Sequence, residues 1–390
     1  MVDEAHLISQ WGRDFRPDYM LLGAQAEAVG APLRLALTAT AAPPVRHEII
    51  RRLQLRDPEI VTGDFDRPNI ELSARHVLTV PDKDEEIVRA AREFTGPGIV
   101  YAATHASAQA AYQTLDSAGE KVTLYHAGLP ARERHEAMRA FLDGSARVIA
   151  ATVAFGMGVD KPDVRWVLHA DPTPSMDEYY QELGRAGRDA RPARVRLLFR
   201  YEDFELARRL TARGVSESAV ARAAAALAAG QALQPDGRQQ TAALVRLADL
   251  GAAVWHADAE VRWTGAMSVA DALIASRAQE EREDEVERTR LTMMRRYAEH
   301  TGCRRSFLLT YFGQDYPGPC LNCDNDLDHP QATAADVPFA VGARVESERW
   351  GHGTVQRYDA DQVTVLFDEH GYRELYMPAV MERGLLRPAT

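Results

Sequence analysis

The sequence predicts an α/β protein with a parallel sheet, followed by smaller helical and β modules. Between residues 61 and 202, short apolar runs alternate with helical patterns of ten or more residues. This alternation indicates right-handed crossovers between parallel strands. After Tyr201 the chain becomes rich in alanine and helical in pattern, and after residue 339 it has short strands separated by glycines.

Composition narrows the class of protein. The chain has 390 residues, enough for two or three domains, and a formal net charge of −11. It shows neither a membrane-length apolar stretch nor a signal-peptide pattern, and three cysteines are too few for a secreted disulfide scaffold. We therefore expect a cytoplasmic protein with no membrane partner. The negative net charge by itself disfavours nucleic acid as a partner. Arginines nevertheless cluster locally at 188–200 and 295–305, so the net charge does not exclude a local nucleic-acid contact.

The first two regions share the α/β pattern. Residues 1–60 are predicted as a partial α/β unit, with a buried strand at 34–37 and an amphipathic helix at 44–55. Residues 61–202 are predicted as a complete unit. Its expected strands lie at 98–101, 122–125, 148–151, 166–170 and 195–199.

Three further regions follow. Residues 203–266 contain two helical patterns, 216–229 and 239–250, and a hairpin at 253–256 and 260–264, an order that suggests a winged-helix-like region. Residues 267–332 combine a long helix, 269–301, with the cysteines, and the acidic run at 280–287 is interpreted as a solvated helix face. A linker at 330–338 leads to residues 339–388, predicted as a small barrel of about five strands.

An acidic box stands at the start of the chain, Asp3-Glu4-Ala5-His6. It follows what would be the end of a buried strand, where α/β sheets bind ligands. One carboxylate can hold Mg²⁺ through water and its neighbour can deprotonate the water that attacks a γ-phosphate. Taken alone, these four residues are explained equally well by a surface turn without a catalytic role.

An aromatic, arginine-containing segment, 9–19, follows the box. Its composition suits stacking on unpaired bases together with phosphate contacts. Core packing of Trp11 and Phe15 remains an alternative.

Four more segments complete the pattern: Leu37-Thr38-Ala39-Thr40-Ala41, Asp64 to Asn69, Ala151 to Pro162, and Gln181-Glu182-Leu183-Gly184-Arg185-Ala186-Gly187-Arg188-Asp189. With the acidic box and the aromatic segment, they resemble the motifs of RecQ-family DNA helicases over residues 1–200, and again around the cysteines. The resemblance implies RecA-like lobes, the first partial and the second complete. It also implies ATP-dependent 3′→5′ DNA unwinding in repair and recombination, with ATP and Mg²⁺ as cofactors.

Arg185 and Arg188, at i and i+3, are predicted to share one helix face and to point across a cleft at the γ-phosphate. The resemblance makes Arg188 the arginine finger, whereas an isolated pair of arginines would indicate surface salt bridges.

The other roles are carried over by resemblance. The catalytic set is Asp3, Glu4, His6, Gln181, Arg185 and Arg188; the nucleotide-coupling set is Thr38, Thr40, Gly158 and Asp160; the DNA-binding set is Gln10, Trp11, Arg13, Phe15, Arg16, His126, Thr152 and Phe155.

The cysteines form a second constellation, Cys303 with the Cys-x-x-Cys pair Cys320 and Cys323. In a cytoplasmic protein this favours Zn²⁺ over a disulfide. Similar RecQ zinc modules have a fourth cysteine where Asp326 stands. A carboxylate can ligate Zn²⁺, so Cys₃Asp is feasible, with His329 as a competing ligand and loss of the metal as a third possibility.

The last module, 341–367, is similar to the Tudor-like barrel at the C-terminus of UvrD-type helicases, which recruits a protein or nucleic acid. A passive cap is the alternative. The expected partners are single-stranded DNA and duplex junctions, with a possible protein partner on the barrel, and the expected oligomeric state is a monomer.

Three features depart from the family pattern. Arg13 stands where the aromatic loop usually has histidine, and Thr104-His105 replaces a more usual Ser-Arg. The 390 residues contain no Gly-Lys-Ser/Thr phosphate loop. Two hypotheses result: a shortened version of a full helicase, or a non-catalytic DNA- or protein-binding fragment. We expect the chain alone to lack ATPase activity and residues 1–60 to expose strand edges.

Overall fold

The computed structural model describes residues 1–8, 22–30, 33–39, 43–156, 159–211, 215–256, 259–328, 338–339, 343–359 and 362–389. The chain divides into two compact units. The first comprises Met1–Thr62, Leu210–Arg288 and Asp368–Gly371, and the second comprises Gly63–Arg209, Thr289–Phe367 and Tyr372–Thr390. Over the described residues, no helix combines the length and the apolar character that a membrane crossing requires.

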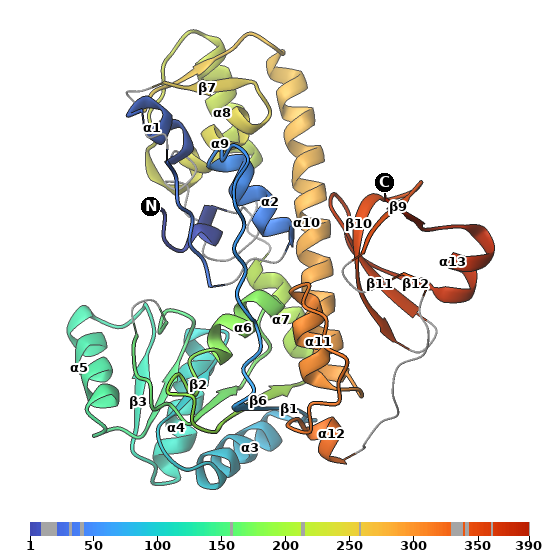
Figure 1. Ribbon diagram of the computed structural model, residues 1–390. Helices are drawn as coiled ribbons and strands as arrows, with labels where there is room; N and C mark the ends of the chain where they lie inside the picture. The colour runs from blue at the N-terminus through green and yellow to red at the C-terminus, as the bar shows by residue number, and fades with distance from the viewer. Residues whose placement is uncertain are drawn as a thin grey trace. The chain divides into compact units, whose positions relative to one another are not determined.

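A six-stranded parallel sheet, in the order β1-β6-β5-β2-β4-β3, is the centre of the second unit (Figure 1). All five predicted strands are present. The bounds are β1 Ile70–His76, β2 Gly98–Tyr101, β3 Val122–Tyr125, β4 Val148–Ala151, β5 Trp166–His169 and β6 Ala193–Phe199. Strands β2, β4 and β5 are buried along their whole length, which explains their continuous apolar runs.

Strand β1 was not predicted. It lies at the edge of the sheet, and only Ile70 and Leu72 are buried, so its sequence contains no continuous apolar run. Edge strands of this kind carry a weaker sequence signal, because half of the strand is in contact with polar surroundings.

Helices connect the strands: α3 Val80–Glu93, α4 His105–Ser117, α5 Ala131–Leu142 and α6 Met176–Leu183, with α7 Tyr201–Thr211 after β6. Capping boxes begin α3 and α4, formed by Thr79 with Asp82 and by Thr104 with Ser107. Trp166 is fully buried in the core of the sheet. A Cβ on Gly98 would lie 1.8 Å from its ring, so this position requires glycine.

The second unit also contains the cysteine region and the last module. The cysteine region follows α10 Val269–Glu299 and includes α11 Arg304–Tyr311 and α12 Asp324–Asp328. The last module is an antiparallel sheet in the order β12-β11-β10-β9-β13, which confirms the prediction of five strands. Its elements are β9 Arg344–Ser347, β10 Gly351–Asp359, β11 Gln362–Phe367, β12 Gly371–Tyr376, α13 Met377–Arg383 and β13 Arg387–Pro388.

In the first unit, the predicted order of two helices and a hairpin is confirmed. Its elements are α8 Glu217–Ala228, α9 Gly237–Asp249, β7 Ala253–Trp255 and β8 Val261–Trp263. The first segment of the chain contributes a short 3-10 helix Ala5–Ile8, α1 Leu22–Ala28 and α2 Pro43–Arg52, packed around Ile8, Ile49 and Leu53.

The buried strand predicted at 34–37 is wrong. Within segment 34–37, all of which the structure describes, only Ala36 forms a bridge, a parallel one with Val2. Leu33, Leu35 and Leu37 are 88%, 50% and 41% exposed. The alternating leucines therefore form an uncovered apolar face in the described structure, as expected for a strand without a full set of sheet neighbours.

The acidic run of α10 is only partly a solvated face. Glu281 and Asp284 are exposed, but Glu283 accepts a hydrogen bond from Arg246 of α9, and Val286 is buried. Burial is the main cause that raises the pKa of Glu283. The run therefore includes a side chain that packs against α9 as well as solvated carboxylates.

Candidate functional site

The acidic box lies in the first unit, beside Leu37 and Thr38. Val2 donates its amide to Leu35 O (2.7 Å), and Ala5 donates to Leu37 O (2.8 Å), so the box follows directly on a parallel bridge. His6 Nδ1 lies 3.0 Å from the Thr38 hydroxyl and 3.4 Å from a Glu4 carboxylate oxygen.

The structure thus brings together three of the predicted residues: Glu4, His6 and Thr38. Glu4 has φ +50°, an uncommon backbone conformation for a non-glycine residue. Asp3 accepts the Glu4 amide at 2.9 Å. Strained carboxylate-bearing turns at strand ends are common at ligand sites, and this turn presents its acidic groups next to a hydroxyl.

The predicted stacking residues of the following loop, Gln10, Trp11, Arg13, Phe15 and Arg16, lie outside the described residues. So do Thr40 of the coupling set, Gly158 after β4 and the alternative zinc ligand His329. Their roles stay predictions.

The arginine box begins at the end of α6. Gln181 lies in the last turn of this helix, which ends at Leu183 with Gly184 as its C-cap. The predicted shared helix face of Arg185 and Arg188 is therefore wrong: both residues lie in the turns that follow. The sequence Gly-Arg-Ala-Gly explains the early end, since glycine is a poor helix former and Gly187 has φ +57°.

Both arginines contact the loop that follows β4. Arg185 Nη1 donates to Gly156 O at 2.6 Å. Arg188 Nη1 donates to Val159 O at 3.0 Å and to the Asp160 carboxylate at 3.1 Å. Asp160 and Arg188 are both exposed, so this ion pair is open to solvent and Arg188 can exchange Asp160 for another anion.

Two residues that were not predicted as site residues hold the arginine box in place. Arg67 Nη2 donates to Ala186 O and to Gly187 O, both at 2.9 Å, and Asn69 donates to Gly187 O at 2.9 Å. Burial lowers the pKa of Arg67. The sequence signal was their place in the segment Asp64 to Asn69, which resembles a family motif but does not show which backbone they contact.

The loop after β4 also contains Thr152 and Phe155 of the predicted DNA-binding set. Thr152 is buried, and its backbone oxygen accepts the Phe155 amide at 2.9 Å. Phe155 is fully buried, with ring contacts to Tyr125 and Phe141. Its ring is therefore part of the core and does not present a face for a base, because the aromatic shell around it already covers it.

A buried cluster lies behind the arginine box. His169 and Glu182 are both buried, with His169 Nε2 2.9 Å from a Glu182 oxygen. The Tyr179 ring lies 4.7 Å from that of His169, and its hydroxyl lies 3.1 Å from the Tyr297 hydroxyl of α10. Burial raises the pKa of Tyr179 and of Tyr297, which keeps both phenols neutral. The cluster links α6 to the helix that precedes the cysteines.

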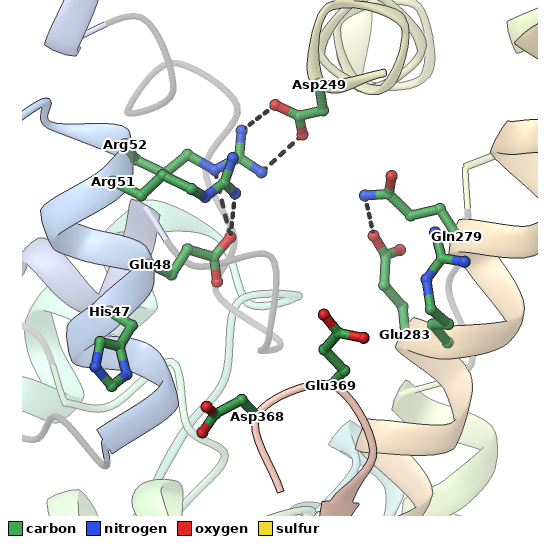
Figure 2. A pocket seen from close by; sticks show the side chains of 10 residues that line it. His47, Glu48, Arg51, Arg52, Asp249, Gln279, Glu283, Asp368 and Glu369 are labelled. Atoms are coloured by element: carbon green, nitrogen blue, oxygen red, sulfur yellow. Dashed lines mark hydrogen bonds and ion pairs between the residues drawn. The ribbon is translucent and has the colours of Figure 1, made fainter. Parts of the chain in front are cut away.

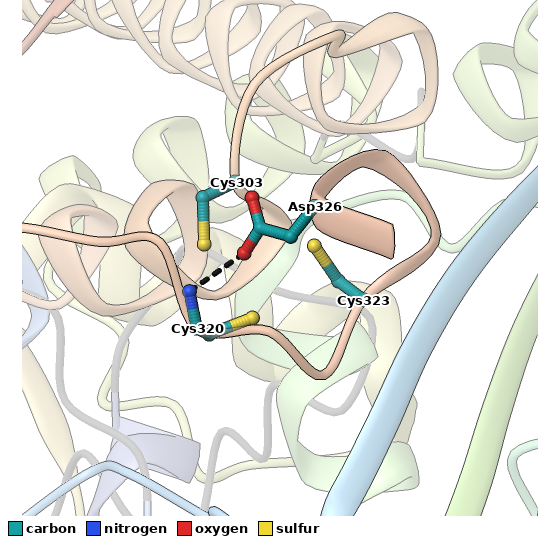
Figure 3. Close-up of side chains that lie close together, drawn as sticks. All are labelled: Cys303, Cys320, Cys323 and Asp326. Atoms are coloured by element: carbon teal, nitrogen blue, oxygen red, sulfur yellow. Dashed lines mark hydrogen bonds between the residues drawn. The ribbon is translucent and has the colours of Figure 1, made fainter. Parts of the chain in front are cut away.

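The cysteine region converges on one point. The ligand atoms of Cys303, Cys320, Cys323 and Asp326 all lie within 4.8 Å of one another, and Figure 3 shows the side chains facing the same small space. Cys323 and Asp326 are 0% and 3% exposed. Hydrogen bonds from Cys303 and Cys320 lower the pKa of the Cys323 thiol, so the cluster favours a thiolate there.

Asp326 has a second role besides its place among the sulfurs. One of its oxygens, Oδ2, accepts the backbone amides of Cys320 (2.6 Å) and Leu321 (3.2 Å). A carboxylate with one oxygen on the loop amides has its other oxygen left for a metal. Three sulfurs and one carboxylate at this spacing fit tetrahedral Zn²⁺.

The cysteine region is anchored on the edge strand β1. Leu72 forms a parallel bridge with Cys323, and Ala74 donates its amide to Asp324 at 2.9 Å. Asn322 donates to Pro68 O and to Ile70 O, at 2.9 and 3.2 Å. The Cys-x-x-Cys loop therefore covers the open edge of the parallel sheet.

The first unit contains a cavity of ≈ 730 Å³ (Figure 2). Its described lining comes from α2, α9, α10 and the turn after β11, and not from the motif segments. Arg52 bridges Asp249 (2.7 Å) and Glu48 (3.3 Å) across one wall. These paired charges are typical of packing between elements.

Comparisons with known proteins find two matching families and a set of similar helicases. Residues 82–190 match the family described as Helicase conserved C-terminal domain, and residues 266–327 match the family described as RecQ zinc-binding. The chain is 31% identical to the ATP-dependent DNA helicase RecQ of Pasteurella multocida, over 85% of this chain and 42% of the relative. It is 38% identical to the probable ATP-dependent DNA helicase RecS of Bacillus subtilis, over 53% of this chain and 42% of the relative.

The chain thus spans about two fifths of the length of these curated relatives. Among solved structures, it is similar to S. cerevisiae Dbp5 bound to RNA and ADP BeF3, at 22% identity and a TM-score of 0.42. That likeness covers 54% of this chain and 56% of the other.

Proposed function

Because this chain belongs to the RecQ family of helicases, we propose that it takes part in ATP-dependent 3′→5′ unwinding of DNA, in repair or recombination. In this proposal it supplies the arginines of the ATP site, contacts to the tracking strand and the zinc module. Its partners are single-stranded DNA and duplex junctions, its oligomeric state is monomeric, and it works in the cytoplasm.

One observation carries the proposal: hydrogen bonds join the arginine box to the loop after β4. Arg185 donates to Gly156 O, and Arg188 donates to Val159 O. In the proposal, the arginines neutralise charge on a γ-phosphate, and the loop after β4 contacts a strand phosphate. A rigid link between the two groups lets hydrolysis and strand movement influence each other.

Within the first unit, the acidic box supplies the complementary chemistry. With ATP bound, Asp3 would hold Mg²⁺ through water and Glu4 would accept the proton of the attacking water, which Thr38 and His6 would orient. Bound ATP and Mg²⁺ would supply the γ-phosphoryl group and its charge neutralisation.

A second candidate function is binding without catalysis. The 390 residues contain no Gly-Lys-Ser/Thr segment, and the lysine of such a loop contacts the β- and γ-phosphates in related ATP sites. On this basis we propose that the chain alone binds DNA but does not turn over ATP. The C-terminal sheet, Arg344–Pro388, is the proposed site for a protein partner.

The deciding experiment measures DNA binding and ATPase activity on the zinc-loaded full chain. Fluorescence anisotropy with labelled oligothymidine should show salt-dependent binding. Phosphate release should be absent with and without DNA. Turnover that disappears in Glu4→Gln would show a working ATP site and favour catalysis, whereas binding without turnover favours the second candidate. A chain that does not bind DNA at any salt concentration would contradict both.

Two arginine variants, Arg188→Ala and Arg132→Ala, test the role of the arginine box in the same assays. Where turnover is present, Arg188→Ala should lower it about a thousandfold or more, as removal of an arginine finger does. Arg132→Ala is the control, because Arg132 is exposed on α5 and pairs with Glu136 of the same helix. Equal effects of the two substitutions would contradict the assigned role of Arg188.

A further inference from the structure

A short segment, residues 64–70, contacts both the cysteine region and the arginine box, and all three lie in the second unit. Asp66 accepts a hydrogen bond from Arg305 of α11, directly after the first cysteine of the metal site. Arg67 and Asn69 instead donate to the backbone of the arginine box. Consecutive residues of the 64–70 segment thus serve two sites that are more than 100 residues apart in the sequence.

Arg305 is the residue through which the cysteine region reaches this segment. Its side chain is 4% exposed, and its guanidinium donates to Ile70 O at 2.6 Å as well as to the Asp66 carboxylate. Burial opposes the charge of Arg305, but hydrogen bonds to Asp66 and to the Cys320 sulfur raise its pKa above the ordinary value. The guanidinium therefore joins a ligand of the metal site to the 64–70 segment.

Arg67 continues this contact to the arginine box. Its guanidinium donates to three carbonyl oxygens in the turns after α6: Gly184 O at 3.2 Å, Ala186 O at 2.9 Å and Gly187 O at 2.9 Å. Arg185 lies between the first two of these residues. Its orientation therefore depends on the place that Arg67 gives to the turn.

An aromatic contact runs parallel to the charged one. The Tyr180 hydroxyl of α6 donates to Phe65 O at 2.7 Å. Both rings lie against Phe312, the C-cap of α11, with centroid distances of 4.7 Å for Tyr180 and 5.0 Å for Phe65. The helix that leads into the arginine box and the helix that follows Cys303 thus meet at the 64–70 segment.

We propose that Asp66 and Arg67 are positioning residues through which the metal state of the cysteine region controls the geometry of the arginine box. This inference rests on the proposed function, because it concerns the arginines that are assigned there to a γ-phosphate. Hydrogen-bond and ion-pair networks between packed elements carry such coupling when one element has two discrete arrangements. Here the two arrangements are those of the cysteine loop with and without its metal.

The coupling follows from the cost of a buried charge that loses a partner. Arg305 is held by two groups, the Cys320 sulfur and the Asp66 carboxylate. When the cysteine loop loses its metal, the sulfur loses its fixed place, and the guanidinium shifts toward the partner that remains. Asp66 moves with it. Its neighbour Arg67 then loses its alignment with the carbonyl oxygens of the arginine box.

The test measures hydrogen exchange by mass spectrometry in a peptide that covers residues 184–191 of the zinc-loaded full chain. The Gly187 amide is bonded to Val164 O at 2.8 Å, so it exchanges only when the turn opens. In wild type, removal of Zn²⁺ with a chelator should speed exchange in this peptide about tenfold, as expected when a hydrogen bond to a charged group is lost.

Two variants show whether the segment carries this effect. Asp66→Asn and Arg67→Gln should each raise exchange in the zinc-loaded chain to the level of metal-free wild type, and removal of Zn²⁺ should then add little. Asp66→Glu restores the carboxylate and should recover the dependence on the metal. A general loss of stability would not be reversed selectively in this way. The zinc content of each variant is measured before exchange begins.

A matched control removes an ion pair next to the segment. Glu71 of β1 pairs with Arg194 at 3.2 Å and takes no part in the contacts to Arg305 or to the arginine box. Glu71→Gln should therefore keep the full effect of zinc removal. A peptide from β2, 98–101, reports any loosening of the whole sheet.

The outcomes are distinct. Exchange in residues 184–191 that does not respond to zinc removal would overturn the inference, and so would an equal response in the β2 peptide. A response of the same size in wild type, Asp66→Asn and Arg67→Gln would also overturn it, because the effect would then bypass the segment. Neither ATP nor DNA is present in this measurement. Coupling in a chain that does not bind DNA would contradict the proposed function alone, and DNA binding without coupling would contradict this inference alone.

Discussion

The guanidinium of Arg185 donates a hydrogen bond to the carbonyl oxygen of Gly156, with an Nη1–O distance of 2.6 Å. A Cβ on Gly156 would lie 2.6 Å from the other terminal nitrogen, Nη2. The turn after α6 and the loop after β4 are therefore fitted to each other at this point. Any side chain at residue 156 has to displace the arginine or the loop.

The first prediction concerns this contact. Gly156→Ala should destabilise the second unit by about 1–3 kcal/mol, the usual cost of overpacking. Where the chain hydrolyses ATP, the substitution should also lower turnover. Urea denaturation measures the first effect. Gly63→Ala is a suitable control, since nothing lies within 4 Å of a Cβ at that position. Similar stability changes in both variants would contradict the fit.

The second prediction concerns the fourth ligand of the metal site. Asp326→Asn keeps an oxygen that can accept the Cys320 and Leu321 amides but loses the negative charge. We expect the affinity for Zn²⁺ to fall about tenfold to a hundredfold, because a neutral amide is a weaker ligand. Competition with a chromophoric chelator measures the affinity. Unchanged affinity would mean that Asp326 only organises the Cys320 loop.

Asp326→Cys separates the two roles of this residue. A fourth thiolate should tighten Zn²⁺ binding relative to Asp326→Asn, while the amides of the loop lose their carboxylate acceptor. Weaker binding than in Asp326→Asn would show that the loop contacts matter more than the charge of the ligand.

The third prediction links the metal to the sheet. Because Leu72 bridges Cys323 and Ala74 donates to Asp324, removal of Zn²⁺ should expose the edge of β1. Hydrogen exchange followed by mass spectrometry should show faster exchange in residues 70–76 after treatment with a chelator. A peptide from the buried strand β2, 98–101, is the internal control. Faster exchange confined to residues 303–326 would contradict the link.

The fourth prediction concerns pH and a buried ion cluster. Lys83 lies 2.8 Å from Asp171 and 2.7 Å from Asp203, and all three side chains are buried. Burial opposes the charge of Asp171, but Lys83 and the Ala103 amide hold its pKa below the ordinary 3.8. A carboxyl with a lowered pKa stabilises the fold above its ordinary value, and that stability is lost as pH falls through the lowered value.

The second unit should therefore lose stability progressively below about pH 4. Lys83→Met should destabilise it by about 3–5 kcal/mol at neutral pH, because two buried carboxylates lose their partner. The loss should shrink toward acid pH, where the carboxyls are protonated. Urea midpoints across the pH range test this. A Lys83→Met penalty that is independent of pH would contradict the charge cluster as its cause.

Several parts of the structure could be predicted because their signals are local. Strands β2, β4 and β5 appear as continuous apolar runs because both of their faces are buried. The helix α8 begins after Ser216, whose side chain accepts the Ala219 amide, and this capping residue marks the start in the sequence. The Cys-x-x-Cys spacing likewise indicates a metal site from the sequence alone.

Other expectations failed because their outcome depends on neighbours distant in the sequence. The segment 34–37 has the pattern of a buried strand, yet its leucines have no covering layer among the described residues. Arg185 and Arg188 have helical spacing, but the turn around Gly187 is held by Arg67 and Asn69, about 120 residues away. Local spacing carries no information on such contacts.

The sequence by itself determined the α/β class, the family, the order of the modules and the residue types available for metal and phosphate chemistry. Only the tertiary structure decided that Arg185 donates a hydrogen bond to Gly156. The same holds for the hydrogen bonds that Asp326 accepts from the cysteine loop and for the stacked rings of His105 and His126. The physical reason is that composition and periodicity report burial and local backbone preference. Contacts between loops instead follow from strand order, which brings the carboxyl ends of β2, β4 and β3 side by side.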